Sequence, residues 1–316
     1  TCYTSEVNVV RAKQERVRMT GREKIVKKIL FIIPTFNHGG SNRHLFNILR
    51  MIDWSKYQID IFGIVDTGPY RKLLSTYNVL PGNFITTGIF QQFDSIKKEN
   101  IFIAVAKTLI KILYRLTKLV SEEKAYKLFV GKALDKLGGY DTVVAVEEGT
   151  ATWFTQYINA ENKIAYVHCD YSYYYKVHSK SEELIYSNYN SIICVSKYTR
   201  EVFINYYPSL KNRVQTIYNV LDLKSIIKMY EDKNENDLRF DELFFSLISI
   251  GRLSPIKRFD IIPGIARELL DRGCKFKWYI VGSGLHYKKI FEQIILHDTK
   301  DTIIMLGEKQ NPYPYI

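Results

Sequence analysis

Residues 28–43, KILFIIPTFNHGGSNR, carry the pattern that decides the fold. The short apolar run at 29–33 is typical of a buried parallel strand, and a turn with two adjacent glycines follows it before a segment of helical period. Further along the chain, short runs rich in Ile, Val and Phe keep alternating with longer helical segments, which is the pattern of βαβ units. The sequence therefore predicts an α/β protein built from doubly wound parallel sheets.

Two series of strand candidates divide the chain. The first series predicts one sheet, with strands at residues 29–33, 59–65, 142–146, 164–167, 192–195 and 214–217. After a polar, charged stretch at 230–242, the second series has strands at residues 244–250, 278–281 and 303–306. We expect a basic extension at 1–27, a first Rossmann-like domain at 28–221 and a second at 222–316, with a ligand held in the cleft between the two domains.

The second domain is expected to be incomplete. Its strand candidates are fewer than the ~5–6 strands of an average sheet. The chain also starts at Thr1 rather than at Met, and it stops at Ile316 without a closing helix or a polar tail. We therefore interpret the sequence as C-terminally truncated.

Composition and charge limit the class of protein. With 316 residues, 46% of them hydrophobic, the chain can bury a full core, which excludes a disordered tail or a peptide hormone. The net charge of +12 is uneven, because residues 1–220 carry +11 and residues 221–316 carry +1. A merely soluble basic domain, a nucleic-acid partner and an anionic lipid surface all fit such a charge. Nucleic acid is disfavoured because the basic residues are spread over many helices and the aromatic cluster at 171–175 lacks an interleaved basic groove.

The sequence favours a cytoplasmic protein. No run of 18 apolar residues and no signal peptide can be recognised. The four cysteines lack Cys-x-x-Cys spacing, so we expect reduced, buried thiols.

A basic amphipathic helix is predicted at residues 101–120. Lys107, Lys111, Arg115 and Lys118 share one helical face, and the opposite side consists of Ile, Leu, Val and Phe. Two interpretations stay open. The helix lies on an anionic membrane at the inner face of the cell, with its cations toward the headgroups, or it is an ordinary surface helix whose apolar stripe lies in the core and whose lysines are solvated.

Candidate binding residues of the first domain follow its strands, because ligands of doubly wound sheets bind at the carboxyl ends of the strands. Gly39 and Gly40 let the backbone approach a ligand, and the helix start after them offers free N–H groups to an anion. His168 follows the strand at 164–167, where it can bind a sugar hydroxyl or a backbone carbonyl. Glu147 and Glu148 end another strand, and we expect at most one of them to face the ligand because adjacent strand residues point opposite ways.

The second domain begins with the strongest candidate site. Residues 247–260, LISIGRLSPIKRFD, place Arg252 and Lys257 just beyond a strand. Two cations and a helix N-terminus can neutralise a departing nucleoside diphosphate in place of Mg²⁺, and no acidic metal ligands lie near them in the sequence. Gly282 and Gly284 end the next strand, where glycines permit close contact with phosphate or ribose. A dinucleotide fingerprint would need a third glycine where Tyr287 stands, so nicotinamide binding is disfavoured.

In order and spacing, the motifs of residues 28–316 resemble those of glycosyltransferase family 4. The most specific part is Gly251-Arg252-Leu253 with Lys257, followed about 30 residues later by Gly282-Ser283-Gly284. The other matching pieces are Gly39-Gly40, His168, Val195-Ser196, Asn219 with Asp222, and Gly307 with Asn311-Pro312-Tyr313-Pro314-Tyr315.

The resemblance implies an enzyme that transfers a sugar from a nucleotide-sugar donor to a saccharide or lipid-linked acceptor. Members of this family are retaining and metal-independent, and this variant looks like those of capsule and other surface-polysaccharide synthesis. The implied catalytic residues are His168, Arg252 and Lys257. The implied donor-binding residues are Gly39, Gly40, Gly251, Arg252, Lys257, Gly282 and Gly284. The implied acceptor-binding residues, in the first domain, are His38, Arg43 and Glu147.

The sequence departs from the family pattern in two respects. The family's paired glutamates are expected beyond Ile316, and Asn42 stands where many relatives carry an acidic residue.

Two other functions remain possible for the same architecture. A nucleotide-sugar epimerase would use a carboxylate such as Glu147 for acid–base chemistry. A non-catalytic partner of another glycosyltransferase would keep the fold and bind no nucleotide sugar.

Overall fold

A computed structural model describes residues 26–37, 39–91, 96, 99–120, 122–172, 182–232, 240, 243–309 and 311–316. The chain divides into two compact units, Thr1–Leu221 (unit 1) and Asp222–Ile316 (unit 2). Of the basic extension expected at residues 1–27, only 26 and 27 lie among the described residues.

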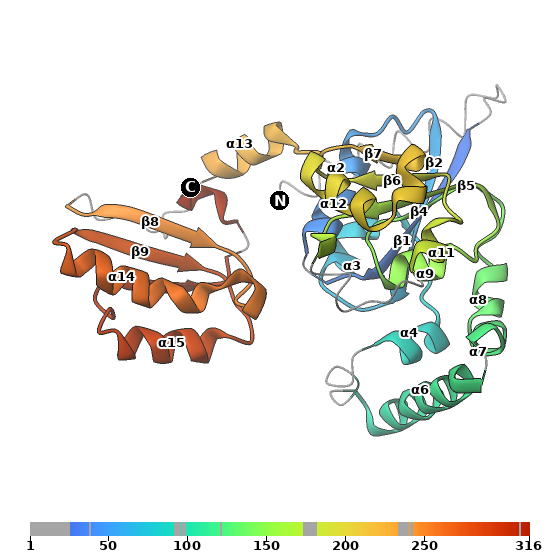
Figure 1. Cartoon of the computed structure of the whole chain (residues 1–316), viewed down its shortest axis with the longest axis horizontal. Helices are drawn as coiled ribbons and strands as arrows, with labels where there is room; N and C mark the ends of the chain where they lie inside the picture. Colours follow the sequence, from blue (N-terminus) through green and yellow to red (C-terminus); the bar gives the residue numbers. More distant parts are fainter. Residues whose placement is uncertain are drawn as a thin grey trace. The chain divides into compact units, whose positions relative to one another are not determined.

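Unit 1 is built on a parallel sheet. In the described part of the unit the strand order is β3-β2-β1-β4-β5-β6-β7, so the order reverses between β1 and β4 (Figure 1). All six predicted strands are confirmed, and only the two-residue strand β3 was missed. The strands are β1 (Lys27–Thr35), β2 (Tyr57–Val65), β3 (Asn78–Val79), β4 (Tyr140–Ala145), β5 (Ala160–Val167), β6 (Ser191–Cys194) and β7 (Val214–Thr216).

Helices cover both faces of this sheet. Along β1, Leu30 and Ile32 join one buried cluster while Phe31 and Ile33 join another, because successive strand residues point to opposite faces. A near-continuous apolar run is what a strand buried on both faces requires. The helices of the unit are α2 (Gly40–Met51), α3 (Tyr70–Leu73), η1 (Leu74–Thr76), α4 (Phe84–Phe90), α6 (Ile101–Val120), α7 (Glu122–Phe129), α8 (Gly131–Asp135), α9 (Thr150–Thr155), α11 (Glu182–Tyr186), α12 (Lys197–Tyr206) and η2 (Pro208–Arg213).

Unit 2 has a second parallel sheet, with strand order β10-β9-β8 over its described residues. Figure 1 shows α14 and α15 side by side on one face of this sheet. The predicted α/β class with two parallel sheets is therefore confirmed. The elements of the unit are α13 (Leu223–Glu231), β8 (Phe245–Ile250), η3 (Pro255–Lys257), η4 (Phe259–Ile261), α14 (Ile262–Asp271), β9 (Phe276–Val281), α15 (Tyr287–Leu296), β10 (Ile303–Gly307) and η5 (Tyr313–Tyr315).

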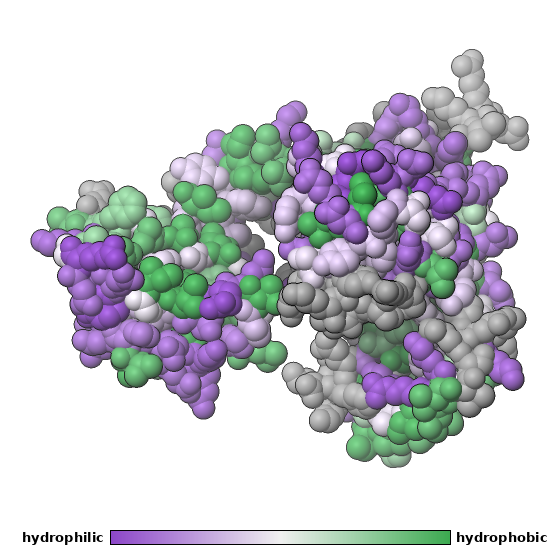
Figure 2. Space-filling model, in the orientation of Figure 1, coloured by the Kyte–Doolittle hydropathy of each residue, from purple (hydrophilic) through white to green (hydrophobic). Residues whose placement is uncertain are grey.

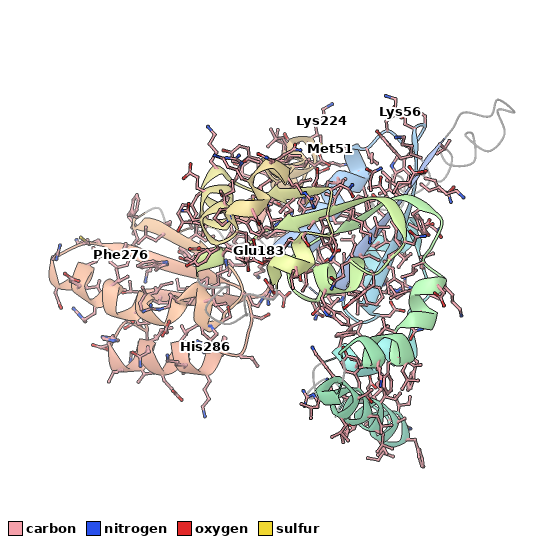
Figure 3. All side chains as sticks on the ribbon, turned by 45° about the vertical axis from the view of Figure 1, so that its right-hand side comes forward. Met51, Lys56, Glu183, Lys224, Phe276 and His286 are labelled. Atoms are coloured by element: carbon pink, nitrogen blue, oxygen red, sulfur yellow. The ribbon has the colours of Figure 1, made fainter. Side chains whose placement is uncertain are left out.

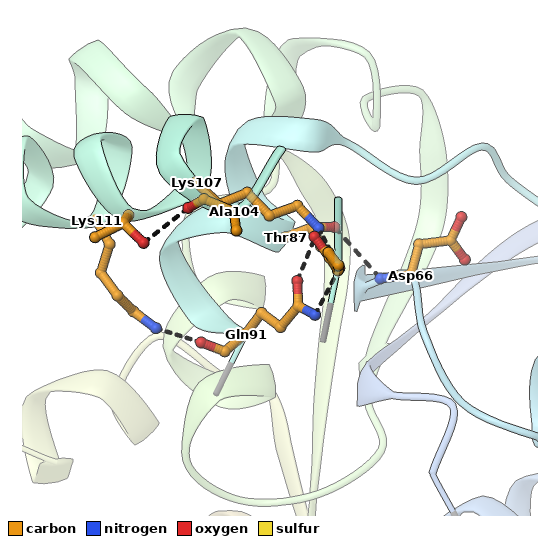
Figure 4. Close-up of polar contacts among 8 residues, drawn as sticks. Asp66, Thr87, Gln91, Ala104, Lys107 and Lys111 are labelled. Atoms are coloured by element: carbon orange, nitrogen blue, oxygen red, sulfur yellow. Dashed lines mark hydrogen bonds and ion pairs between the residues drawn. The ribbon is translucent and has the colours of Figure 1, made fainter. Parts of the chain in front are cut away.

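The orientation of α6 differs from both interpretations of the sequence. Lys107 and Lys111 are each only 6% exposed and face the rest of unit 1, whereas Leu109, Leu113 and other apolar side chains of the helix are exposed. The expectation of a buried apolar stripe is therefore wrong (Figure 2), and the expectation of solvated lysines is wrong for Lys107 and Lys111 (Figure 4), although Lys118 is exposed. The expectation that Lys107 and Lys111 point outward toward lipid headgroups is wrong as well. The predicted helical segment itself is confirmed. Among the described residues, no helix combines the length and the apolar character needed to cross a membrane.

The cysteines agree only in part with the expected buried thiols. Cys194 is buried in β6, Cys169 is half-buried and Cys274 is exposed, so the expectation is wrong for Cys274. Cys2 lies outside the described residues.

Candidate functional site

The predicted binding loop of unit 1 lies where the strand order reverses. The loop after β1 leads into α2, and β4 ends beside it. Gly39 is the N-cap of α2, with its carbonyl accepting from the N–H of Arg43 at 3.1 Å. No side chain caps this helix start and its first turn holds no acidic residue. Its first N–H groups therefore remain available to an anion or a polar ligand.

Gly40 faces open space. A Cβ atom at Gly40 would meet no protein atom within 4 Å. Packing within unit 1 therefore does not require a glycine at this position, and the space beside it can admit a ligand.

The two glutamates after β4 bind to opposite neighbours in the sheet. A carboxylate oxygen of Glu147 accepts a hydrogen bond from Oγ of Ser41 in the first turn of α2. A carboxylate oxygen of Glu148 accepts from the backbone N–H of His168 at 2.8 Å, beyond the end of β5. Adjacent residues thus point to different sides, as the alternation of a strand predicts. Glu147 lies with the glycine loop of β1, and Glu148 lies with β5.

His168 is held by the backbone of the same sheet edge. Its Nε2 lies 3.0 Å from the carbonyl oxygen of Val146. Because a carbonyl can only accept, Nε2 carries the proton, and Nδ1 of the neutral ring is left as an acceptor. Burial lowers the pKa of His168, while the charge of Glu148 and the bond to Val146 oppose this shift. The ring can therefore accept a hydrogen bond from a hydroxyl group.

His44 is a polar residue of this site that the sequence reasoning missed. Its side chain is 3% exposed, and its ring centroid lies 5.6 Å from that of His168 in an edge-on arrangement. Burial, followed by the nearby His168, lowers the pKa of His44 to about 4, so the ring is neutral near pH 7. The sequence could have indicated His44 as a site residue, because it lies three residues after Ser41 and therefore on the same face of α2.

The last residues of unit 1 are attached to α2. The backbone N–H of Val220 donates to Nδ1 of His44 at 3.2 Å, and its carbonyl accepts from the side-chain amide of Asn47 at 2.8 Å. The backbone N–H and C=O of Val220 are thus both hydrogen-bonded to buried side chains of α2.

Three further residues that the sequence analysis singled out, His38, Asn42 and Arg43, belong to the turn between β1 and α2 or to the start of α2. Buried Asn42 donates to the carbonyls of Thr35 and Asn37 at 2.9 and 2.7 Å, which an acidic side chain could not do. It therefore stabilises the turn between β1 and α2. The guanidinium of Arg43 lies 5.6 Å from the centre of the Phe46 ring. His38 lies outside the described residues.

The predicted loops of unit 2 meet at one edge of its sheet. Gly251 donates its N–H to the carbonyl of Val281 at 3.0 Å, and Gly282 donates to Gly307 at 2.8 Å. The N–H of Leu253 likewise donates to the carbonyl of Ser283 at 2.9 Å. In Figure 3, Phe276 marks the start of β9 and His286 lies just before α15, so the loop that carries Gly282 runs between these two elements. The ends of β8, β9 and β10 thus form one hydrogen-bonded edge.

Gly282 and Gly284 have a packing role that the sequence did not reveal. Both have positive φ angles, 149° and 155°. A Cβ at Gly282 would lie 1.9 Å from the carbonyl oxygen of Gly251, and one at Gly284 would lie 2.3 Å from that of Leu253. These glycines therefore allow the loops after β8 and β9 to approach each other.

The two predicted cations of unit 2 are exposed at this edge. Arg252 follows Gly251 directly, and Lys257 ends the short helix η3. Arg258 follows in the left-handed conformation, with φ 53°, which turns the chain into η4. The structure thus places Arg252, Lys257 and the three glycines on connected loops of unit 2, and Gly39, Gly40, Glu147 and His168 on neighbouring loops of unit 1.

Comparison with solved structures identifies the fold. The chain resembles HepE of Anabaena, solved in complex with UDP and glucose, with a TM-score of 0.60 and 16% identity over 92% of this chain and 71% of that one. It also resembles a mutant of S. aureus TarM, solved with fondaparinux, alpha-GlcNAc-glycerol and UDP, with a TM-score of 0.57 and 14% identity over 91% of this chain and 78% of that one. This is the GT-B glycosyltransferase fold.

A third similar structure is a glycosyltransferase from Rickettsia africae, with a TM-score of 0.53 and 13% identity over 92% of this chain and 71% of that one. No protein-family model matches the chain, and no curated protein matches it. At these identities the likeness establishes the GT-B fold and no more.

Proposed function

We propose that the chain is a glycosyltransferase of family 4 that moves a sugar from a nucleotide-sugar donor to a saccharide or lipid-linked acceptor. The transfer retains the anomeric configuration, needs no metal ion and serves surface-polysaccharide synthesis on the cytoplasmic side of the membrane. The observation that carries the proposal is the edge of unit 2, where Arg252 and Lys257 stand exposed on the loop after β8, which backbone hydrogen bonds fix to the end of β9 and the loop after it.

The donor diphosphate is assigned to unit 2. A nucleoside diphosphate leaves with developing negative charge, and fixed cations stabilise this charge in the transition state. Arg252 offers a planar fork of N–H groups that suits two phosphate oxygens, whereas Lys257 acts as a point charge. Gly282 and Gly284 let the loops after β8 and β9 pack closely together, which holds the loop of Arg252 and Lys257 in place.

The transferred sugar and the acceptor are assigned to unit 1. The uncapped start of α2 and the open space beside Gly40 favour a phosphate or sugar oxygen. The Glu147 carboxylate can accept from acceptor hydroxyls, with His38 and Arg43 as further contacts. His168 binds a sugar hydroxyl through Nδ1, since Nε2 is committed to Val146.

The base of the donor is proposed from the solved complexes. HepE and the TarM mutant were each solved with UDP. A uridine diphosphate sugar is accordingly the first donor to test.

Calorimetric titration tests this function. UDP, GDP and ADP are titrated into the chain with and without Mg²⁺, beside Arg252→Ala and the matched exposed-cation control Lys300→Ala. We expect metal-independent binding of one nucleotide, lost in Arg252→Ala and kept in Lys300→Ala. Absence of binding by all three nucleotides would overturn the proposal in favour of a non-catalytic partner. Conversion of the sugar nucleotide without any acceptor would overturn it in favour of an epimerase.

A further inference from the structure

One side-chain contact joins the loops that follow β5 and β6. The hydroxyl of Tyr198 donates to Oδ2 of Asp170 at 3.2 Å. Asp170 comes two residues after His168, beyond β5, and Tyr198 lies in the first turn of α12, which follows β6. Neighbouring parallel strands end at the same edge of a sheet, so this pair belongs to the edge that carries His168.

Both members of the pair are held in place although they are exposed. Oδ1 of Asp170 accepts from the backbone N–H of Ser172 at 2.9 Å and from the Ser172 hydroxyl at 2.7 Å, which forms an Asx turn. The hydroxyl of Ser196 accepts from the N–H of Thr199 at 3.0 Å and so caps the helix turn that carries Tyr198. Tyr198 nevertheless remains 59% exposed. A polar pair that is fixed and still open to solvent is suited to bind a ligand.

The carboxylate of Asp170 is charged at neutral pH. The hydrogen bonds from Ser172, and to a smaller extent the one from Tyr198, lower the pKa of Asp170. Among the residues that the structure describes, no lysine or arginine forms an ion pair with this carboxylate. A carboxylate oxygen accepts more than one hydrogen bond, so Oδ2 can take a second donor beside Tyr198. Asp170 can therefore accept from a sugar hydroxyl, whereas it repels an anionic group.

The acceptor nitrogen of His168 is turned toward this pair. Nε2 of His168 is bound to the carbonyl of Val146, just beyond β4. The two nitrogens lie on different edges of an imidazole ring, so Nδ1 points away from β4. Asp170 and Tyr198 lie on that side, because β6 is the other neighbour of β5. A sugar that donates a hydroxyl to Nδ1 of His168 thus lies next to the Asp170 carboxylate.

We propose that Asp170 selects an uncharged transferred sugar and rejects a uronic acid, whose carboxylate would lie beside that of Asp170. This inference rests on the proposed function, since it names the class of sugar that the nucleotide-sugar donor carries. Repulsion of the wrong ligand is a common source of specificity. Two like charges about 5 Å apart at a partly solvated site give a preference of roughly tenfold. Tyr198 is a positioning residue, because its hydroxyl keeps the carboxylate in one orientation.

Calorimetric titration with two sugar nucleotides tests this selection. UDP, UDP-glucose and UDP-glucuronate are titrated into the wild type, Asp170→Asn and the control Asp53→Asn. Oδ1 of Asp53 accepts from the N–H and the hydroxyl of Ser55 at 3.0 and 2.7 Å, which is the same turn, but Asp53 precedes β2 and so lies at the opposite edge of the sheet. Thermal unfolding of each variant verifies that it is folded.

The expected result is a difference between the two sugars that depends on one charge. The wild type and Asp53→Asn should bind UDP-glucose roughly tenfold more tightly than UDP-glucuronate. Asp170→Asn should lose most of this preference, because it binds UDP-glucuronate more tightly. Tyr198→Phe should lose part of the preference, since the carboxylate is then less well fixed. Added salt should reduce the preference of the wild type.

Two results would overturn the role of Asp170. One is equal affinity of the wild type for the two sugar nucleotides, and the other is a preference for UDP-glucose that Asp170→Asn leaves unchanged. UDP, which carries no sugar, separates this inference from the proposed function. A wild type that binds UDP without discriminating between the sugars refutes the selection and leaves the glycosyltransferase proposal standing. A wild type that binds no nucleotide refutes both.

Discussion

The side chains of Ser41 and Glu147, 106 residues apart in the sequence, form a hydrogen bond across the point where the strand order of unit 1 reverses. Ser41 begins α2 beyond β1, and Glu147 follows β4, the strand next to β1. Neighbouring parallel strands end at the same edge, and a crevice forms there because the helices that follow them depart to opposite faces. The bond therefore fixes a carboxylate at the place where ligands of doubly wound sheets bind.

Removing this bond should weaken acceptor binding selectively. Ser41→Ala leaves Glu147 without one charged hydrogen bond, whose typical contribution corresponds to a ~10-fold effect. We expect the KM for the acceptor to rise about that much while the Kd for the donor nucleotide stays unchanged, and Glu147→Gln should have a larger effect in the same direction. Steady-state kinetics with varied acceptor checks this result, and an unchanged acceptor KM in both variants would contradict the role of Glu147.

Arg252→Ala should lower turnover without affecting folding. Loss of one contact to the developing charge of a leaving group commonly costs ~10²–10³ in rate. Because Arg252 is exposed at a loop, the Tm of the variant should stay near that of the wild type. Sugar-transfer assays of Arg252→Ala and Lys300→Ala provide the comparison. Near-normal turnover in Arg252→Ala would refute the assigned role.

Alanine at two glycines should separate ligand binding from folding. Gly40→Ala meets no protein atom and stands at the start of a helix, so the free energy of unfolding should be unchanged or slightly higher, while nucleotide-sugar affinity falls. Gly282→Ala forces a Cβ against the carbonyl of Gly251 at a φ of 149°. The free energy of unfolding of this variant should therefore be lower by roughly 2 kcal/mol or more. Urea unfolding and calorimetry of both variants give the two quantities. Equal destabilisation by the two substitutions would be inconsistent with these backbone positions.

Unit 1 should lose stability in mild acid because of His44. The pKa of His44 is about 4 in the folded protein and about 6.5 when unfolded, so only the unfolded chain binds a proton between these values. The free energy of unfolding should therefore fall as the pH drops from 6.5 to 4, by at most about 1.4 kcal/mol per pH unit from this residue. Below pH 4 this contribution becomes constant.

Chemical unfolding of wild type and His44→Gln across this pH range isolates the contribution, because other titrating groups cancel in the difference. His286→Gln is a control, since His286 lies in a separate unit. A difference between wild type and His44→Gln that does not vary with pH would exclude the buried neutral state of His44.

The orientation of α6 should depend on Lys107. Its ammonium group is buried and its ion pair with Glu99 is partly buried, and its removal takes one donor from Glu99 and the donor to Oε1 of Gln91, although Gln91 still donates to Glu99. We expect Lys107→Ala to lower the free energy of unfolding by roughly 1–2 kcal/mol, whereas the exposed control Lys136→Ala should change it by less than about 0.5 kcal/mol. Denaturant unfolding measures both. A neutral effect of Lys107→Ala would mean that packing elsewhere fixes the helix.

The sheets were predictable because their strands are buried on both faces. An apolar run such as residues 29–33 gives the same signal whatever surrounds it, and the glycine turns after the strands place the binding loops. Strand β3 has only two residues, too few for any periodic signal. The sequence could therefore locate His168, Arg252 and the glycine loops at strand ends, but it could not give their contacts.

Side-chain orientation and long-range pairing were not predictable in the same way. The amphipathic pattern of α6 is identical whether its lysines or its leucines face the protein, and the partner that decides between them, Gln91, belongs to a different helix. The partners of Gly282 lie about 30 residues away, so its packing role is also absent from the local pattern. His44 looks like any helical polar residue until β5 brings His168 beside it.

The bonds of Val220 to His44 and Asn47 set a limit on how unit 1 can be produced by itself. A recombinant fragment that ends after Thr216, the last residue of β7, would contain every strand of the sheet. It would nevertheless leave two buried side chains of α2 without their backbone partners, beside the glycine loop. A fragment that ends at Leu221 retains both bonds, so these few residues after the last strand belong to the first folding unit rather than to a dispensable tether.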